Sequence, residues 1–134
     1  MKVRWLDASI RLRITPTELT GLILGQELGQ TIEFPGGAAW TVRVLPQCRA
    51  ADLIWCGDAL CVCLREEDVA ELAEGDTEGV YFTTGGGRPI RYFVEKDFPC
   101  AHPHPEEAAD PETERFAPTE SYLRRKQTAL TERP

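Results

Sequence analysis

The chain has no hydrophobic run approaching the roughly 20 apolar residues that a membrane helix needs. It also lacks the apolar N-terminal segment of a secretory signal peptide. Histidine is scarce: the 2 histidines both follow residue 100, so acid–base catalysis elsewhere would need other side chains. No Gly-x-Ser-x-Gly or His-Glu-x-x-His motif occurs, and the glycines 85–87 precede an expected strand rather than the helix of a phosphate loop. The sequence thus offers no catalytic residue and favours a protein that is not an enzyme.

The composition is that of an ordinary globular protein, with 134 residues, 42% hydrophobic and 28% charged. The formal net charge is −7, which argues against nucleic-acid binding, because that affinity depends on neutralising phosphates with cations. The 5 cysteines are an odd number without an export signal, so we expect reduced thiols and a cytoplasmic protein.

An internal repeat with an offset of 50 residues organises residues 1–97. Turn glycines and alternating apolar positions coincide between the two halves without a gap, which predicts two pseudo-repeats at about 1–47 and 51–97. The identical pairs are Trp5/Trp55, Leu22/Leu72, Gly25/Gly75, Gly29/Gly79, Gly36/Gly86, Gly37/Gly87 and Val44/Val94.

Each half has the pattern of two hairpins with a short helix between them. Thr15 before Pro16, with Glu18 three residues on, is typical of a capped helix start, and a second helix is expected over 66–73. The predicted fold is α+β: duplicated ββαββ units that form an antiparallel β-barrel or a two-layer sheet with two short helices.

The composition changes after Asp97, where prolines recur and residues 106–114 are acidic without a counter-charge. We expect residues 1–97 to form a single domain. Residues 98–134 should be an irregular, Pro-rich, acidic tail that is partly disordered. A short helix over 120–130 would have only a thin apolar face, made of Tyr122, Leu123 and Leu130.

Cations gather on one face of the first hairpin. A two-residue turn at Asp7-Ala8 pairs Arg4 with Arg11 and Lys2 with Arg13, and strand alternation points all four away from the apolar side. One interpretation is a site for a phosphate, nucleotide or carboxylate, with Arg43 and Arg91 as further members. The other is a solvated sheet face balanced by Glu33, Glu95 or the acidic tail.

Thiols occupy the equivalent face of the second hairpin, where Cys56, Cys61 and Cys63 lie beside Asp52. Three thiolates could bind zinc or another thiophilic metal, although small side chains in a second packed layer would give the same pattern. A second metal hypothesis uses Cys100, His102 and His104, which alternate along a short segment of the tail. Its alternative is a solvated tail in which the three side chains are close only along the chain.

Two resemblances follow from these residues. The segments Ser9–Thr15 (SIRLRIT) and Val94–Cys100 (VEKDFPC) make the chain similar to a family of small bacterial proteins of unknown function, over most of residues 1–107. That resemblance implies a bacterial cytoplasmic protein and no particular activity. An eight-stranded tunnel lined with Arg and Lys would also resemble the triphosphate tunnel enzymes. However, residues 2–5 (KVRW) lack the glutamates of that family's first strand.

Three functions therefore compete. The leading hypothesis is a non-enzymatic module that binds a small anionic ligand or an acidic protein segment through the cationic residues. The first alternative is a metal- or thiol-binding protein that uses the Cys and His residues. The second is a phosphate hydrolase of the tunnel kind.

Overall fold

In the computed structural model, which describes residues 1–99 and 114–132, the protein is a mixed α+β structure of two four-stranded sheets and three helices. The strands are β1 (Lys2–Leu6), β2 (Ser9–Ile14), β3 (Leu28–Glu33), β4 (Ala39–Cys48), β5 (Asp52–Cys56), β6 (Ala59–Arg65), β7 (Gly79–Thr83) and β8 (Arg91–Lys96). The helices are α1 (Pro16–Ile23), α2 (Glu66–Ala73) and α4 (Glu120–Thr131).

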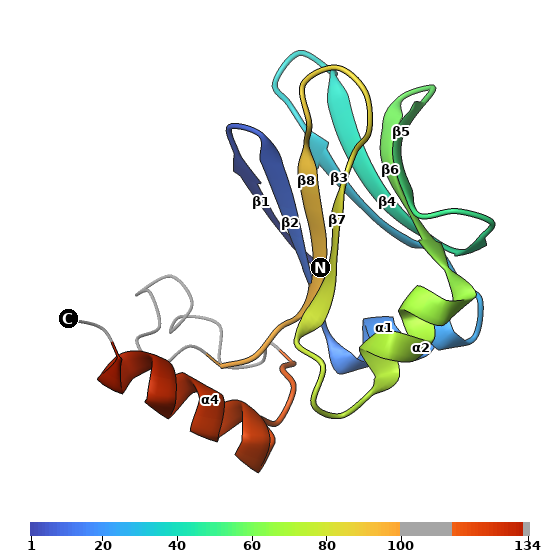
Figure 1. Ribbon diagram of the computed structural model, residues 1–134. Coiled ribbons are helices and arrows are strands. Elements are labelled where there is room, and N and C mark those ends of the chain that lie inside the picture. The colour runs from blue at the N-terminus through green and yellow to red at the C-terminus, as the bar shows by residue number, and fades with distance from the viewer. Residues whose placement is uncertain (100–113, 133–134) are drawn as a thin grey trace.

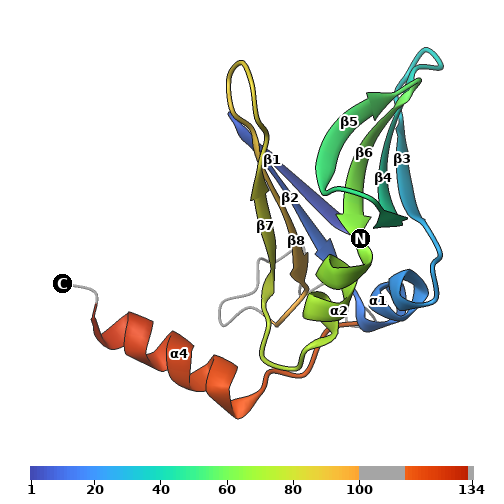
Figure 2. The ribbon, with the colours of Figure 1, turned by 45° about the vertical axis from the view of Figure 1, so that its right-hand side comes forward.

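Each sheet combines a hairpin from the first half of the chain with a hairpin from the second. Sheet A has the strand order β1-β2-β8-β7, and sheet B has the order β3-β4-β6-β5. The sheets face each other, and α1 and α2 lie at one end of the pair, where they carry the chain from one sheet to the other (Figures 1 and 2).

The central pairs, β2 with β8 and β4 with β6, are parallel, so the expected all-antiparallel arrangement is wrong at the middle of each sheet. The sheets also do not close into the barrel that was one of the two expected forms. Each parallel pair joins strands of two different hairpins, and only the two strands within one tight hairpin must run antiparallel. The strands of residues 1–99 therefore do not form the closed barrel on which the tunnel-enzyme hypothesis was based.

The local predictions are confirmed. Thr15 caps α1 and accepts a hydrogen bond from the Glu18 backbone, while the Glu18 carboxylate accepts one from the Thr15 backbone. The helix α2 spans the expected residues, and the two-residue turns set the registers of both β1–β2 and β5–β6 as predicted.

One apolar core fills the space between the sheets and the two short helices. Its members come from the alternate positions of the central strands and from one side of each helix. At the end away from the helices, Trp5 of sheet A packs edge-on against Trp40 of sheet B, with ring centroids 5.7 Å apart. The core residues are Ile10, Leu12, Ile14, Leu19, Leu22, Val42, Val44, Val62, Leu64, Val69, Leu72, Val80, Tyr92 and Val94.

The tail was expected to be irregular, but its described part contains α4, at the residues where the sequence allowed a short helix. Phe116 packs on the core, its backbone N–H donates to the Asp97 carbonyl, and the Tyr122 ring stacks on Phe98. Ser121 and Arg125 of α4 also donate hydrogen bonds to Asp76, and Lys126 forms an ion pair with Glu78, while α4 extends away from the two sheets (Figure 2). No helix of the described residues has both the length and the apolar character that spanning a bilayer requires.

Candidate functional site

The outer face of sheet A carries the predicted cation cluster. Ile10, Leu12 and Ile14 of β2 are buried toward sheet B, so the alternating arginines of that strand point outward. Arg4 lies directly opposite Arg11, and Lys2 directly opposite Arg13. Parallel pairing of β2 with β8 adds Arg91 to the same face, beside Ser9. We call this set the cationic face: Lys2, Arg4, Arg11, Arg13 and Arg91.

Two carboxylates partly balance the cationic face. Glu95 of β8 lies beside Arg13 in the register, and its Oε1 is 2.6 Å from Nε of Arg11. These two atoms are buried but not aligned for a hydrogen bond, so the contact is an ion pair only. Lys2 Nζ lies 3.0 Å from Oδ2 of Asp97, which is itself buried. Of the two acidic residues expected as partners, Glu95 is present on this face, whereas Glu33 belongs to β3 of sheet B.

Arg4 and Arg13 form no ion pair or side-chain hydrogen bond with any residue that the structure describes. They line a small cavity of about 200 Å³ together with Lys2, Val3 and Arg11. Like charges directly opposite each other destabilise a sheet. A negatively charged group bound between these cations would therefore reduce their repulsion.

Aromatic rings adjoin the cations. One row across sheet A reads Tyr81, Phe93, Arg11 and Arg4, because each residue lies directly opposite the next in the strand registers. The Arg11 guanidinium carbon is 5.5 Å from the centre of the Phe93 ring, and that of Arg91 is 5.9 Å away. The Tyr81 ring packs on Phe93 with centroids 5.4 Å apart. The Tyr81 hydroxyl lies 3.3 Å from Glu95, and burial together with that carboxylate raises the pKa of Tyr81 to about 12.

Arg43 does not belong to this cluster. It lies on β4, opposite Gly29 of β3 and Cys61 of β6, and it alternates with the buried Val42 and Val44. It therefore occupies the outer face of sheet B, on the other side of the core from the cationic face.

The outer face of sheet B holds the predicted thiols. Cys61 and Cys63 are buried there although they point away from the core, and Cys56 is exposed. A fourth thiol, Cys48, joins them because β4 shifts its register between Leu45 and Cys48. Burial and the neighbouring Cys56 raise the pKa of Cys61, and burial with the neighbouring Cys48 raises the pKa of Cys63 to about 12.

These thiols do not form a metal site in the described structure. Within residues 1–99 and 114–132, no three His, Cys, Asp or Glu side chains are arranged to hold a metal ion. The other proposed ligands, Cys100, His102 and His104, lie outside the described residues, so that hypothesis stays a prediction.

Comparison with known proteins places the chain in a family. A family model described as "Family of unknown function (DUF7009)" matches residues 1–114. The chain belongs to DUF7009. Membership of a family of unknown function is thereby confirmed over residues 1–114, whereas the expected bacterial origin and the two segments given for the resemblance stay predictions. The searches of curated proteins and of solved structures found no match.

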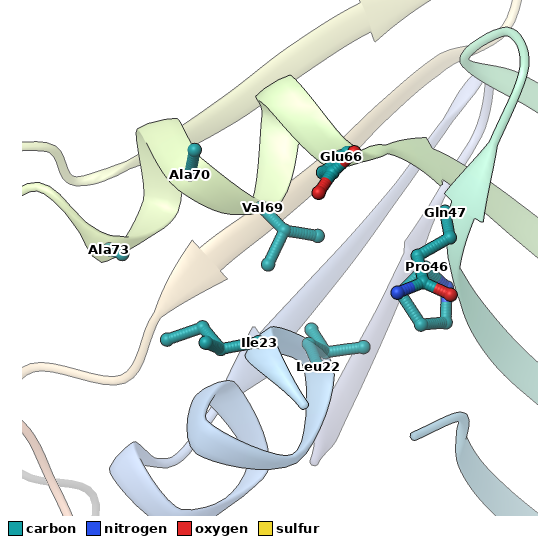
Figure 3. Close-up of a pocket in the computed structure, with 8 residues that line it drawn as sticks. All are labelled: Leu22, Ile23, Pro46, Gln47, Glu66, Val69, Ala70 and Ala73. Atoms are coloured by element: carbon teal, nitrogen blue, oxygen red, sulfur yellow. The ribbon is translucent and has the colours of Figure 1, made fainter. Parts of the chain in front are cut away.

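The DUF7009 match includes all eight strands, and hence both outer faces, whereas α4 follows it. The matched region also contains a site that the sequence analysis missed, an apolar cavity of about 340 Å³ between α1, α2 and the end of β4 (Figure 3). At its rim, Gln47 has a φ of 62°, a left-handed conformation that is uncommon outside glycine. The lining residues are Leu22, Ile23, Pro46, Gln47, Glu66, Val69, Ala70 and Ala73.

The aromatic neighbours of the cations were also missed. Their positions depend on the pairing of β2 with β8, which no local pattern specifies. Strand alternation over 91–95 was the available signal, because it places Arg91, Phe93 and Glu95 on one face of their strand.

Proposed function

We propose that the protein is a binding module that holds a small anionic ligand on the cationic face of sheet A. The observation that carries this proposal is the pair of arginines, Arg4 and Arg13, that border one cavity and have no acidic partner among the described residues. Guanidinium groups bind phosphates and carboxylates through paired, charge-assisted hydrogen bonds.

The charge balance of the face supports an anion. Among the described residues, two carboxylates, Glu95 and Asp97, accompany the five cations of this face, Lys2, Arg4, Arg11, Arg13 and Arg91. Because Glu95 is engaged with Arg11 and Asp97 with Lys2, an added anion would relieve the repulsion between Arg4 and its opposite neighbour. Arg4 and Arg13 would contact the ligand. Arg11, which lines the same cavity, would add positive charge beside them.

We also propose that the two halves of the chain arose by duplication. In support, the parallel register Ser9↔Arg91 of sheet A corresponds to Ala59↔Thr41 of sheet B with the same offset of 50 residues. On this view the cationic face is a specialisation of one sheet of the pair. The free thiols on the other sheet suit a reducing, cytoplasmic compartment.

The test is a calorimetric titration of the full chain with pyrophosphate at low salt. We expect the wild type to bind and the double variant Arg4→Gln/Arg13→Gln to bind at least tenfold more weakly, because charged hydrogen bonds contribute about 1.5–3 kcal/mol each. Arg43→Gln is the matched control: it removes one cation from sheet B and should leave the affinity unchanged.

Two results would overturn the proposal. One is the absence of binding by the wild type, or equal binding by all variants. The other is binding of an acidic peptide, with the sequence of residues 106–114, in the absence of pyrophosphate binding, which would assign the face to a protein segment.

A further inference from the structure

The cationic face borders two aromatic rings, Tyr81 and Phe93, that an inorganic anion would not use. The Tyr81 side chain is 52% exposed and rests on Phe93, while the Arg91 guanidinium covers another part of the Phe93 ring. Exposed rings and guanidinium planes are the surfaces on which nucleobases stack, through π contacts and cation–π attraction.

We infer that the ligand is a mononucleotide, with its base stacked on Tyr81 beside Phe93 and its phosphates held by Arg4 and Arg13. This inference rests on the proposed function and names the class of anion. The aromatic half of the face would bind the base, and the cationic half would bind the phosphates.

The spacing along the sheet fits such a ligand. Tyr81, Phe93, Arg11 and Arg4 follow one another on adjacent strands, which lie about 4.8 Å apart in a sheet. The backbone of Arg11 is thus about 10 Å from that of Tyr81, and Arg4 is one strand further. Because arginine side chains are long, Arg4 and Arg13 can meet the phosphates of a nucleoside diphosphate whose base lies over Tyr81.

The corresponding row of sheet B shows that a sheet of this fold can form without aromatic rings next to arginines on its outer face. That row reads Gly29, Arg43, Cys61 and Ile54, and it contains one cation and no aromatic ring. Of these two rows, only the one on sheet A therefore combines rings with more than one cation.

The overall charge favours a single nucleotide over a nucleic-acid strand. Binding to a polyanion depends on a surface that neutralises many phosphates, whereas this chain carries a net charge of −7. The cationic face provides only a few cations, which suits one or two phosphate groups.

The experiment compares ADP, pyrophosphate and adenosine as probes of the full chain, without divalent cations, by calorimetry. We expect ADP to bind about tenfold more tightly than pyrophosphate. Tyr81→Leu should lower the affinity for ADP about tenfold without changing that for pyrophosphate. Tyr81→Phe, which keeps the ring, should lose less affinity for ADP than Tyr81→Leu, and Arg43→Gln on the outer face of sheet B is the control that should bind ADP like the wild type.

The outcomes separate this inference from the proposed function. Equal affinities for ADP and pyrophosphate, unchanged by Tyr81→Leu, would overturn the mononucleotide inference and leave the anion site intact. No binding of either phosphate would overturn both. Tighter binding of a short single-stranded oligonucleotide than of ADP would also overturn the inference, in favour of a nucleic-acid strand. Pyrophosphate binding by Tyr81→Leu would show that the variant is folded.

Discussion

Sheets A and B have corresponding strand orders and matching central registers, yet their outer faces carry different chemistry. Toward the core, both present aliphatic side chains at equivalent positions, such as Ile14 and Leu64. Away from the core, sheet A presents arginines where sheet B presents Cys61 and Cys63. The inner faces are thus constrained by packing, while the outer faces are free to differ. Because packing of the core does not require the arginines on the outer face of sheet A, their presence there indicates a function.

The largest expected effect concerns the shared inner pattern. Ile14 and Leu64 occupy equivalent places in β2 and β6, and both are fully buried. Ile14→Ala and Leu64→Ala should each lower the free energy of unfolding by about 2–5 kcal/mol, through lost burial and the cavity that remains. Denaturant unfolding measures both. A loss below about 1 kcal/mol for either variant would contradict equal roles for the two sheets in the core.

The second prediction concerns two glycines, Gly29 and Gly79, that occupy equivalent positions in the two halves but have different space around them. A Cβ on Gly79 would lie 2.7 Å from the Val94 carbonyl oxygen and 3.0 Å from Glu95 Cα, whereas a Cβ on Gly29 would meet only Arg43 Cγ at 3.9 Å. Gly79→Ala should therefore cost about 1–3 kcal/mol of stability through overpacking. Gly29→Ala should stabilise by up to about 1 kcal/mol, since glycine weakens a strand interior. Thermal unfolding of the two variants tests this, and a cost for Gly29→Ala equal to that of Gly79→Ala would refute the steric argument.

The third prediction concerns the start of α2, where Arg65 contacts Asp68. Burial alone would raise the pKa of Asp68, but hydrogen bonds from the Arg65 side chain and backbone outweigh it and lower the pKa. Because the folded state then binds fewer protons than the unfolded state, Asp68 stabilises the fold above its ordinary pKa, and this stabilisation is lost as the pH falls through the lowered value. Asp68→Asn should cost about 1–3 kcal/mol at pH 7.

Unfolding curves at several pH values measure this effect. The Asp68→Asn variant should lose less stability than the wild type on acidification below about pH 4, the ordinary range of an aspartate. Identical pH dependence of the two proteins would show that the contact with Arg65 does not lower the pKa.

The smallest effect is a difference in thiol reactivity within sheet B. Cys56 is exposed and Cys48 half-buried, whereas Cys61 and Cys63 are buried and have raised pKa values. Alkylation at pH 8 should modify Cys56 first, Cys48 next, and Cys61 and Cys63 last, because only an accessible thiolate reacts. Peptide mass spectrometry measures the order. Early modification of Cys61 would indicate a thiolate site on sheet B and revive the metal hypothesis.

The local structure could be predicted because short-range rules determine it. The turn at Asp7-Ala8 sets the register of the first hairpin, and Thr15, Pro16 and Glu18 together start α1. The placement of Lys2, Arg4, Arg11 and Arg13 on one face followed directly from that register.

The pairing between hairpins could not be predicted in the same way. Whether β2 joins β8 depends on how α1 and α2 carry the chain between the sheets, which is a property of long-range packing. That pairing brought Phe93 and Glu95 next to Arg11 and separated Arg43 from the cluster. Across the sheet the sequence thus indicated Arg91 and Glu95 correctly, misplaced Arg43, and gave no sign of Tyr81 and Phe93 beside the cations.

The central claim is that sheet A, not sheet B, is the binding sheet. Backbone amide chemical shifts of the isotopically labelled full chain, recorded during titration with pyrophosphate, test this most directly. We expect saturable shifts that cluster on β1, β2 and β8 around Arg4 and Arg13, with the amides of β5 and β6 unchanged. Shifts centred on β5 and β6, or no saturable shifts at all, would contradict it.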